Sequence, residues 1–166
     1  FKAGDQEAFN YIYNYYKNSL YSFIFSYTND SQDAEEVFQD TFVRIHNRIQ
    51  DLEKLESFES WAFSIAHSMT MSFLKRNKKK KYFQLEEDID VEDDFSIVDN
   101  YEKGEVVDTL KKEFEELNPI FKSVAHLRYL EELSVNEIAT TLSVPVGTVK
   151  RRLSRIREIT GSYTNL

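Results

Sequence analysis

Residues 134–157 read SVNEIATTLSVPVGTVKRRLSRIR, a pattern of two short helices joined by a tight turn. Ser134 and Glu137 have the spacing of a capping box, in which each side chain accepts a hydrogen bond from the other residue's backbone amide. Pro145 lacks a backbone donor and disfavours helix in the residue before it, so it predicts the turn. This stretch therefore predicts a helical hairpin.

The second predicted helix, from about residue 146, is basic on one side. Its inward stripe consists of Val149, Leu153 and Ile156, at offsets of four and three. Off that stripe lie Lys150, Arg151, Ser154, Arg155 and Arg157, with Arg152 nearer its edge. A helical hairpin with a solvated basic face is the simplest alternative. The capping box, the proline turn and the one-sided charge together favour a helix-turn-helix whose second helix enters a DNA groove.

The composition favours an all-α fold. Four glycines and two prolines leave few turns for an all-β chain, while thirteen Phe and ten Tyr can fill helical cores. The absence of cysteine excludes a disulfide scaffold and a thiolate metal site, and it fits a reducing cytoplasm. No apolar run approaches the roughly 20 residues of a membrane span. The start FKAGDQEAF has no signal-peptide character, so no membrane insertion is expected.

The net charge of −8 is unevenly distributed along the chain. The run KRNKKKK at 75–81 holds six basic residues in seven, whereas the segment 86–102 holds nine acidic residues and no basic one. Phosphate contacts depend on local clusters of Lys and Arg rather than on the overall charge. The acidic total therefore does not exclude DNA binding.

The spacing of apolar residues predicts two groups of helices separated by an acidic segment. Three amphipathic helices are expected before residue 81 and about four after residue 105, with the helix-turn-helix last. The segment 82–104 has dense acid and weak periodicity, which is typical of a linker. The sequence therefore predicts an all-α chain of two small helical domains, 1–81 and 105–166, joined by an acidic linker. Such a linker is also hypothesised to screen a basic DNA-binding face.

Patterns that would indicate catalysis are absent from the sequence. His46, His67 and His126 lie in separate predicted helices, without an HExxH motif or a His/Cys pair that would hold a metal. Neither a GxxxxGK[ST] nor a GxGxxG loop is present to hold phosphate. The sequence thus predicts no cofactor, no metal site and no enzymatic activity.

Four blocks in a fixed order resemble the extracytoplasmic-function (ECF) group of bacterial sigma factors, of the sigma-70 family. They are GDQEAF at 4–9, DAEEVFQDTF at 33–42, FESWAFSIAH at 58–67, and the stretch from LNPIF to RLSRIR at 117–157. The second and last blocks are the specific ones. The resemblance covers nearly the whole chain apart from the acidic linker, and it implies a two-domain, all-helical subunit of RNA polymerase in the bacterial cytoplasm.

The resemblance implies a role for each domain. The N-terminal domain, sigma region 2, would bind the polymerase clamp and melt the minus-ten element. The C-terminal domain, region 4, would read the minus-thirty-five element and touch the polymerase flap. An anti-sigma factor is a further expected partner. The residues implied to bind core polymerase are Asp33, Glu36, Gln39 and Asp40. Those implied to meet minus-ten DNA are Trp61, His67, Ser68, Ser72, Lys75 and Arg76. Those implied to meet minus-thirty-five DNA are Thr148, Lys150, Arg151, Ser154 and Arg155.

This chain departs from the family's pattern in its third helix. The family usually has a basic residue and then Asn where this chain has His67 and Ser68, an Asp where it has Ser72, and a Leu where it has Ala62. These departures predict an altered minus-ten base preference or weaker melting.

Three functions are open at this point. The first is an ECF-type sigma factor that binds core RNA polymerase and directs promoter-specific transcription initiation. The second is a helix-turn-helix regulator that acts without core polymerase. The third is a sigma-like module that titrates polymerase or an anti-sigma factor, and Ser68 and Ser72 are its only support.

Overall fold

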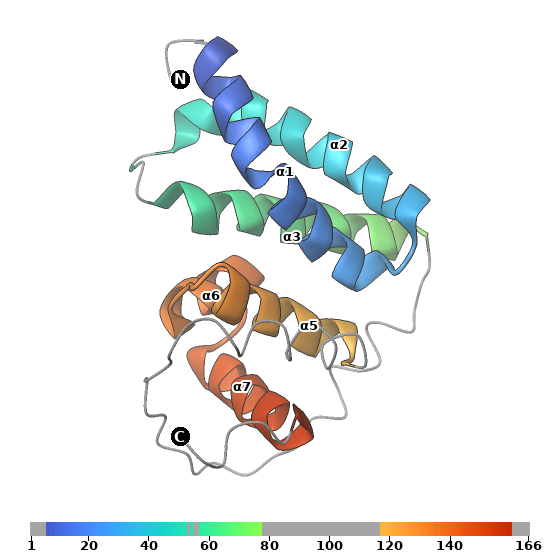
Figure 1. Cartoon of the computed structure of the whole chain (residues 1–166), viewed down its shortest axis with the longest axis vertical. Coiled ribbons are helices and arrows are strands. Elements are labelled where there is room, and N and C mark those ends of the chain that lie inside the picture. Colours follow the sequence, from blue (N-terminus) through green and yellow to red (C-terminus); the bar gives the residue numbers. More distant parts are fainter. Residues whose placement is uncertain (1–5, 53, 55–56, 78–116, 161–166) are drawn as a thin grey trace. The chain divides into compact units, whose positions relative to one another are not determined.

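The computed structural model describes residues 6–52, 54, 57–77 and 117–160, and every structural statement below concerns those ranges. All regular elements within them are helices (Figure 1). The chain divides into two compact units, Phe1–Lys79 and Lys80–Leu166. The predicted all-α class with two helical domains is therefore confirmed. The acidic linker predicted at 82–104 lies outside the described residues, as does the helix expected from about residue 106.

The first unit contains α1 (Gln6–Thr28), α2 (Ser31–Arg48), the short 3₁₀ helix η1 (Ile49–Asp51) and α3 (Phe58–Arg76). Asn29 adopts a left-handed conformation with φ of 50°, which turns the chain out of α1. Asp30 then caps α2, because its Oδ1 accepts hydrogen bonds from the amides of Gln32 and Asp33 at 2.9 Å each. The three helices pack on one another around a common core.

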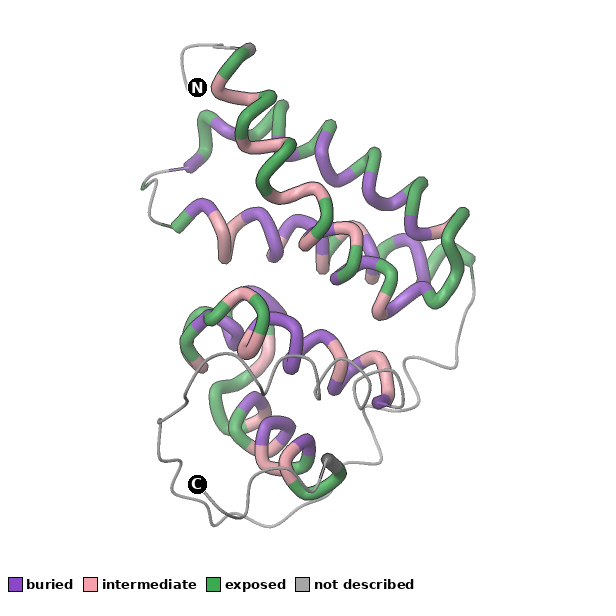
Figure 2. Tube along the Cα trace, viewed as in Figure 1, coloured by how far each residue is buried: buried purple, intermediate pink, exposed green. Residues whose placement is uncertain are grey.

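Aromatic and aliphatic side chains fill the core of the first unit. The side chains with the least exposure there are Leu20, Phe23, Ile24, Ala34, Ile45, Ala62, Phe63, Ala66 and Leu74, each 0% exposed. Figure 2 shows buried positions recurring along α1, α2 and α3, with exposed positions between them. On α2 and η1 the apolar spacing predicts an inward stripe of Ala34, Val37, Phe38, Thr41, Ile45 and Ile49, and all six are buried. The apolar spacing of α3 also predicts that Trp61 and Met69 face inward, but both are only half-buried.

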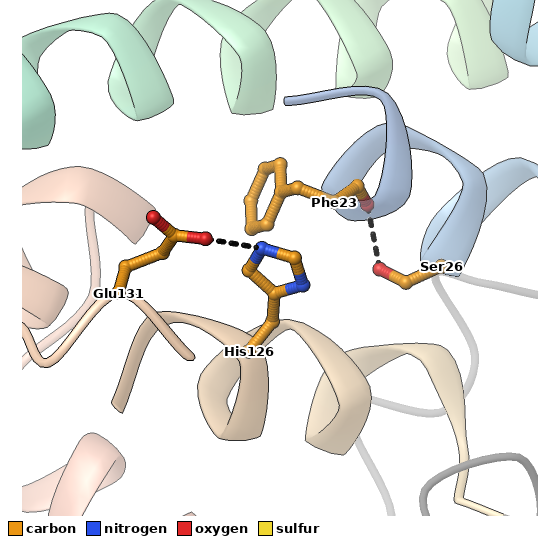
Figure 3. A network of polar contacts seen from close by, with 4 residues as sticks. All are labelled: Phe23, Ser26, His126 and Glu131. Carbon is orange, nitrogen blue, oxygen red and sulfur yellow. Dashed lines mark hydrogen bonds and ion pairs between the residues drawn. The ribbon is translucent and has the colours of Figure 1, made fainter. Parts of the chain in front are cut away.

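Two buried threonines bond to their own helices. Thr41 Oγ1 donates to the Val37 carbonyl and Thr70 Oγ1 donates to the Ala66 carbonyl, each at 2.7 Å. A buried hydroxyl without a partner would destabilise the core, so these bonds allow two polar residues inside it. Ser26, half-buried on α1, bonds in the same way to the Phe23 carbonyl at 2.6 Å (Figure 3).

The second unit contains α5 (Pro119–Ala125), the π-helical turn η4 (His126–Leu130), α6 (Val135–Leu142) and α7 (Val146–Thr160). As the sequence indicates, a new helix begins at Pro119, where Asn118 Oδ1 accepts from the amide of Ile120 at 2.9 Å. The buried aliphatic residues come from every element of the unit. They include Val124, Leu127, Leu133, Ile138, Leu142, Val149, Leu153 and Ile156.

Polar contacts hold the turn between η4 and α6. His126 Nε2 lies 3.0 Å from Glu131 Oε1, and both side chains are 8% exposed (Figure 3). Arg128 Nη1 donates to the Leu133 carbonyl at 3.1 Å, and the Leu133 amide donates to the Leu127 carbonyl at 2.9 Å. These bonds fix the direction in which the chain enters α6.

The predicted capping box is present at the start of α6. Ser134 Oγ accepts from the Glu137 amide at 3.2 Å, and Glu137 Oε2 accepts from the Ser134 amide at 2.8 Å. Hydrogen bonds from Ser134, first from its side chain and then from its backbone, hold the pKa of Glu137 below its ordinary value of 4.5. The folded state therefore favours the ionised carboxylate.

We expect Ser134→Ala to lower the free energy of unfolding by about 1 kcal/mol, since the first turn of α6 loses its side-chain acceptor. Because the pKa of Glu137 is lowered on folding, its contribution is present above the unfolded pKa and is lost as pH falls through the folded one. The difference between the two proteins should therefore shrink below about pH 4. Urea unfolding followed by circular dichroism at pH 7 and pH 3.5 measures it, with Ser134→Asp as the control that keeps an acceptor. Equal stability of wild type and Ser134→Ala at pH 7 would contradict the prediction.

Candidate nucleic-acid and polymerase interfaces

The turn between α6 and α7 is built from backbone hydrogen bonds. Ser143 adopts a left-handed conformation with φ of 55°, and the Val144 amide donates to the Ala139 carbonyl at 3.0 Å. The Pro145 carbonyl then accepts from the amides of Thr148 and Val149 at 3.0 and 3.3 Å, which starts α7. The predicted interruption by Ser143, Val144 and Pro145 is confirmed, and α6 and α7 form a helix-turn-helix.

The packing of α7 against the rest of its unit determines which side of the helix stays accessible to a ligand. Val149, Leu153 and Ile156 are at most 3% exposed, as their spacing predicts, and Arg152 joins them at 6%. Lys150 and Arg155 are exposed, while Thr148, Arg151 and Ser154 are half-buried. At about 100° per residue, these five lie away from the buried stripe. The structure thus brings all five predicted duplex contacts to one side of α7.

Glu158 also lies on this side and was missed by the sequence analysis. It follows Ser154 by one turn, and its Oε2 lies 2.7 Å from Nη1 of Arg155. Both side chains are about half exposed, at 53% and 55%. The spacing of three residues between an acid and a base on one helix could have indicated this pair. A carboxylate therefore holds one of the guanidinium groups expected to contact DNA.

The acidic and polar row predicted on α2 lies on the surface of the first unit. Glu36, Gln39 and Asp40 are exposed and Asp33 is half-buried, and their spacings place them on one side of the helix. Gln39 Nε2 also donates to Glu35 Oε1 at 2.9 Å.

Val43 extends this row toward the C-terminus of α2 and was not predicted. It stands three and four residues after Asp40 and Gln39 and is 61% exposed. An apolar residue at the next position of a polar helix face was visible in the sequence as a signal, because it departs from the polar pattern. The four predicted residues and Val43 together form the α2 surface.

The predicted residues of α3 do not all share one side. Trp61, Ser68, Ser72 and Lys75 recur at intervals of seven, four and three, so they form one face, and Arg76 lies beside it. Trp61 is half-buried, and the other four are exposed. His67 instead lies on the flank of α3.

The ring of His67 is 5.7 Å from the ring of Tyr27 on α1, which places it in an intramolecular contact. Met71, half-buried beside Ser68 and Ser72, belongs to the Trp61 face although the sequence analysis did not select it. Both placements follow from the direction in which α3 packs on α1.

The described parts of the chain offer neither a metal-binding cluster nor a membrane-spanning helix. No group of three or more His, Cys, Asp or Glu side chains there could hold a metal ion. Among the same residues, no helix has the length and apolar character needed to cross a bilayer.

Comparisons with known proteins give matches to both units. Residues 12–80 match the family model "Sigma-70 region 2", and residues 114–159 match "Sigma-70, region 4". The ECF RNA polymerase sigma factor SigW of Bacillus subtilis is 30% identical over 166 residues, which cover 95% of this chain and 89% of SigW. The ECF RNA polymerase sigma-E factor of Haemophilus influenzae is 30% identical over 174 residues, covering 95% of this chain and 88% of that protein.

A solved structure has the same fold. The sigma factor RpoE in complex with the anti-sigma factor NepR from Bartonella quintana matches with a TM-score of 0.64 at 21% identity, covering 93% of this chain and 94% of that one. At this identity the likeness concerns the arrangement of helices.

We expect Glu158→Gln to strengthen binding to duplex DNA of any sequence, because the substitution removes a negative charge from α7 and releases Arg155. If Arg155 then gains a phosphate contact, the slope of log affinity against log salt should steepen by about 0.9. Fluorescence anisotropy of labelled duplexes at several salt concentrations measures this.

A matched control exists in the first unit, where Arg48 Nε and Asp51 Oδ2 form an exposed pair at the same spacing and also at 2.7 Å. Asp51→Asn removes the same charge away from α7 and should leave the slope unchanged. The same slope for Glu158→Gln and wild type would show that the ion pair does not restrain Arg155.

Proposed function

We propose specific roles for the residues of this chain, which belongs to the ECF group of the sigma-70 family and directs transcription initiation together with core RNA polymerase. Core polymerase and promoter DNA are its partners. We assign residues 1–81 to region 2, 82–104 to an acidic linker and 105–166 to region 4. Support for these limits comes from the two matched ranges, 12–80 and 114–159, and from the two compact units.

Region 2 binds the polymerase clamp through the α2 surface. Three of its side chains are exposed and polar, and none of Glu36, Gln39 and Asp40 is needed to fill the core. The exposed Val43 at its C-terminal end supplies apolar area that a partner would bury beside the acidic groups. This combination is typical of a protein–protein interface rather than of a solvated helix.

The Trp61 face of α3 captures unpaired bases of the minus-ten element. Trp61 offers an aromatic ring for stacking, the hydroxyls of Ser68 and Ser72 offer hydrogen bonds, and Lys75 and Arg76 attract the backbone. His67 acts indirectly, by packing on Tyr27. Since Ser68 and Ser72 replace an Asn and an Asp of the family's usual pattern, the base preference at these positions differs from that pattern.

Region 4 reads the minus-thirty-five element with α7 in the major groove and also touches the polymerase flap. Thr148, Lys150, Arg151, Ser154 and Arg155 supply the contacts, and Arg is suited to the O6 and N7 acceptors of guanine. The observation that carries the proposal is the presence, in one chain, of this duplex-reading helix and the Trp61 face. A regulator that only bound duplex DNA would need α7 alone.

Three further assignments rest on family membership. The chain acts without catalysing a reaction of its own, it works in the bacterial cytoplasm, and an anti-sigma factor regulates it. The last assignment is supported by a relative of the same fold, RpoE, whose solved structure is a complex with the anti-sigma factor NepR.

Run-off transcription on genomic fragments with purified core polymerase tests the whole proposal. Transcripts should depend on this chain, and Glu36→Ala combined with Gln39→Ala should reduce them because core binding weakens. Asp51→Asn, which removes an exposed carboxylate outside the α2 surface, is the control. DNA binding without any dependent transcript would contradict the proposal.

Replacing Arg151 by Ala should weaken promoter binding by about 1–3 kcal/mol and relax the base preference at one position, if its guanidinium reads a base edge. Competition binding against a set of single-base variants of the minus-thirty-five element measures both effects. An equal loss on every variant would identify Arg151 as a phosphate contact instead.

A further inference from the structure

Four ring contacts link the solvent side of α1 to the Trp61 face of α3. Tyr11 stacks on Tyr15, with ring centres 6.4 Å apart and an angle of 21° between the planes. Tyr15 meets Tyr16 at 4.8 Å, Tyr16 meets Phe58 at 5.3 Å, and Phe58 meets Trp61 at 5.9 Å. We call these five residues the aromatic track. Its one contact between helices joins Tyr16 of α1 to Phe58 of α3, which are 42 residues apart in the sequence.

The outer end of the aromatic track is not part of the core. Tyr11 is 72% exposed and Tyr15 is 67% exposed, the two highest values among the large hydrophobic side chains that the structure describes. The core-facing side of α1 is formed by other residues, including Leu20, Phe23 and Ile24, which are all 0% exposed. Packing therefore does not explain why two stacked rings stand in solvent.

The surroundings of Tyr11 and Tyr15 carry few charges, and one of them is Glu7, which is exposed in the first turn of α1 and lies one turn before Tyr11. Between residues 8 and 22 the sequence has one charged residue, Lys17. Its Nζ donates to Asn14 Oδ1 at 3.2 Å and lies 6.0 Å from the ring centre of Tyr13, a residue on the inner side of the helix. Beside the tyrosines stand Asn18 and Ser22, both exposed and both able to donate and accept hydrogen bonds. Ring faces beside neutral polar groups suit nucleobases, whereas a phosphate or a charged peptide would need opposite charge here.

We propose that the aromatic track extends the single-strand surface of α3 onto α1, so that unpaired bases next to those at Trp61 stack on Tyr15 and Tyr11. The inference rests on the proposed role of Trp61, and the nearness of that face is what selects unpaired DNA as the occupant. The ring contacts reach Trp61 through Phe58, which is only 5% exposed, so the bases stack on the exposed ends of the track and not on Phe58. Stacking on exposed rings tolerates any base, because every base has an aromatic face. The track holds the open strand without contributing to sequence preference.

The test uses holoenzyme assembled from core polymerase and the full chain. The DNA is a promoter recovered by run-off transcription, prepared with a mismatched, pre-melted minus-ten region. The fluorescent base 2-aminopurine is placed at successive positions of the non-template strand, since its emission falls when it stacks on an aromatic ring. Binding affinity is measured on the same DNA by competition.

In wild-type holoenzyme, quenching should extend beyond the positions that depend on Trp61. Tyr11→Ser combined with Tyr15→Ser should restore emission at the flanking positions only and weaken binding about fivefold or more. Tyr11→Phe combined with Tyr15→Phe keeps both rings and should behave as wild type. Because both residues are largely exposed, the serine variant should unfold at the same temperature as wild type.

Phe25→Ser is the matched control. Phe25 is also an exposed aromatic residue of α1, at 39%, and its ring stacks on Tyr21 at 6.3 Å. It lies ten residues beyond Tyr15, about 15 Å along the helix. Its replacement should change neither quenching nor affinity.

The outcomes separate this inference from the proposed function. If Trp61→Ala abolishes quenching at its own positions but the serine variant has no effect, the aromatic track is wrong and the role of α3 stands. If Trp61→Ala changes quenching at no position, the proposed minus-ten role fails. If the serine variant instead loses assembly with core polymerase, the exposed tyrosines form a protein interface and the inference is overturned.

Discussion

The burial of Val149, Leu153 and Ile156 is the constraint on which the DNA-reading surface depends. These three side chains occupy one side of α7 and are at most 3% exposed, so the residues on the opposite side of the helix, among them Lys150 and Arg155, face outward. The left-handed Ser143 and the Pro145 carbonyl set the direction in which α7 leaves the turn. The buried apolar stripe of α7 therefore determines which way the basic side chains on the opposite side of the helix point. The same reasoning holds for α2, whose buried Val37, Thr41 and Ile45 leave its polar row in solvent.

Charge in this protein acts locally. The net charge of −8 would disfavour DNA if it were spread evenly, but α7 holds four arginines and a lysine within eight residues, and all of them except the buried Arg152 are exposed or half-buried. Glu158 moderates that helix through one exposed ion pair, whose energy is small because solvent screens it. The α2 surface carries the opposite sign and the aromatic track carries almost none. Three surfaces of different chemistry thus suit three kinds of contact, to duplex DNA, to protein and to unpaired bases.

Much of this could be predicted from the sequence, since the relevant interactions connect residues three or four positions apart. The capping box of Ser134 and Glu137, the cap at Asp30 and the new helix at Pro119 all formed as their spacing indicated. The outward placement of Lys150 and Arg155 followed from the apolar stripe. The pair Arg155–Glu158 was equally local but was missed, because a single acid at the end of a basic helix resembled ordinary solvation.

The sequence by itself determined the helices, their caps, the helix-turn-helix and the sides of α2 and α7 that face solvent, because helical periodicity and local hydrogen bonds decide these. Only the tertiary structure decided which residues of α3 are used in contacts within the protein. His67 packs on Tyr27, and Tyr16 meets Phe58, across helices whose relative direction no local pattern encodes. The exposure of Tyr11 and Tyr15 follows from that packing as well. Side chains distant in sequence come into contact only when packing in the core has set the angles at which the helices cross.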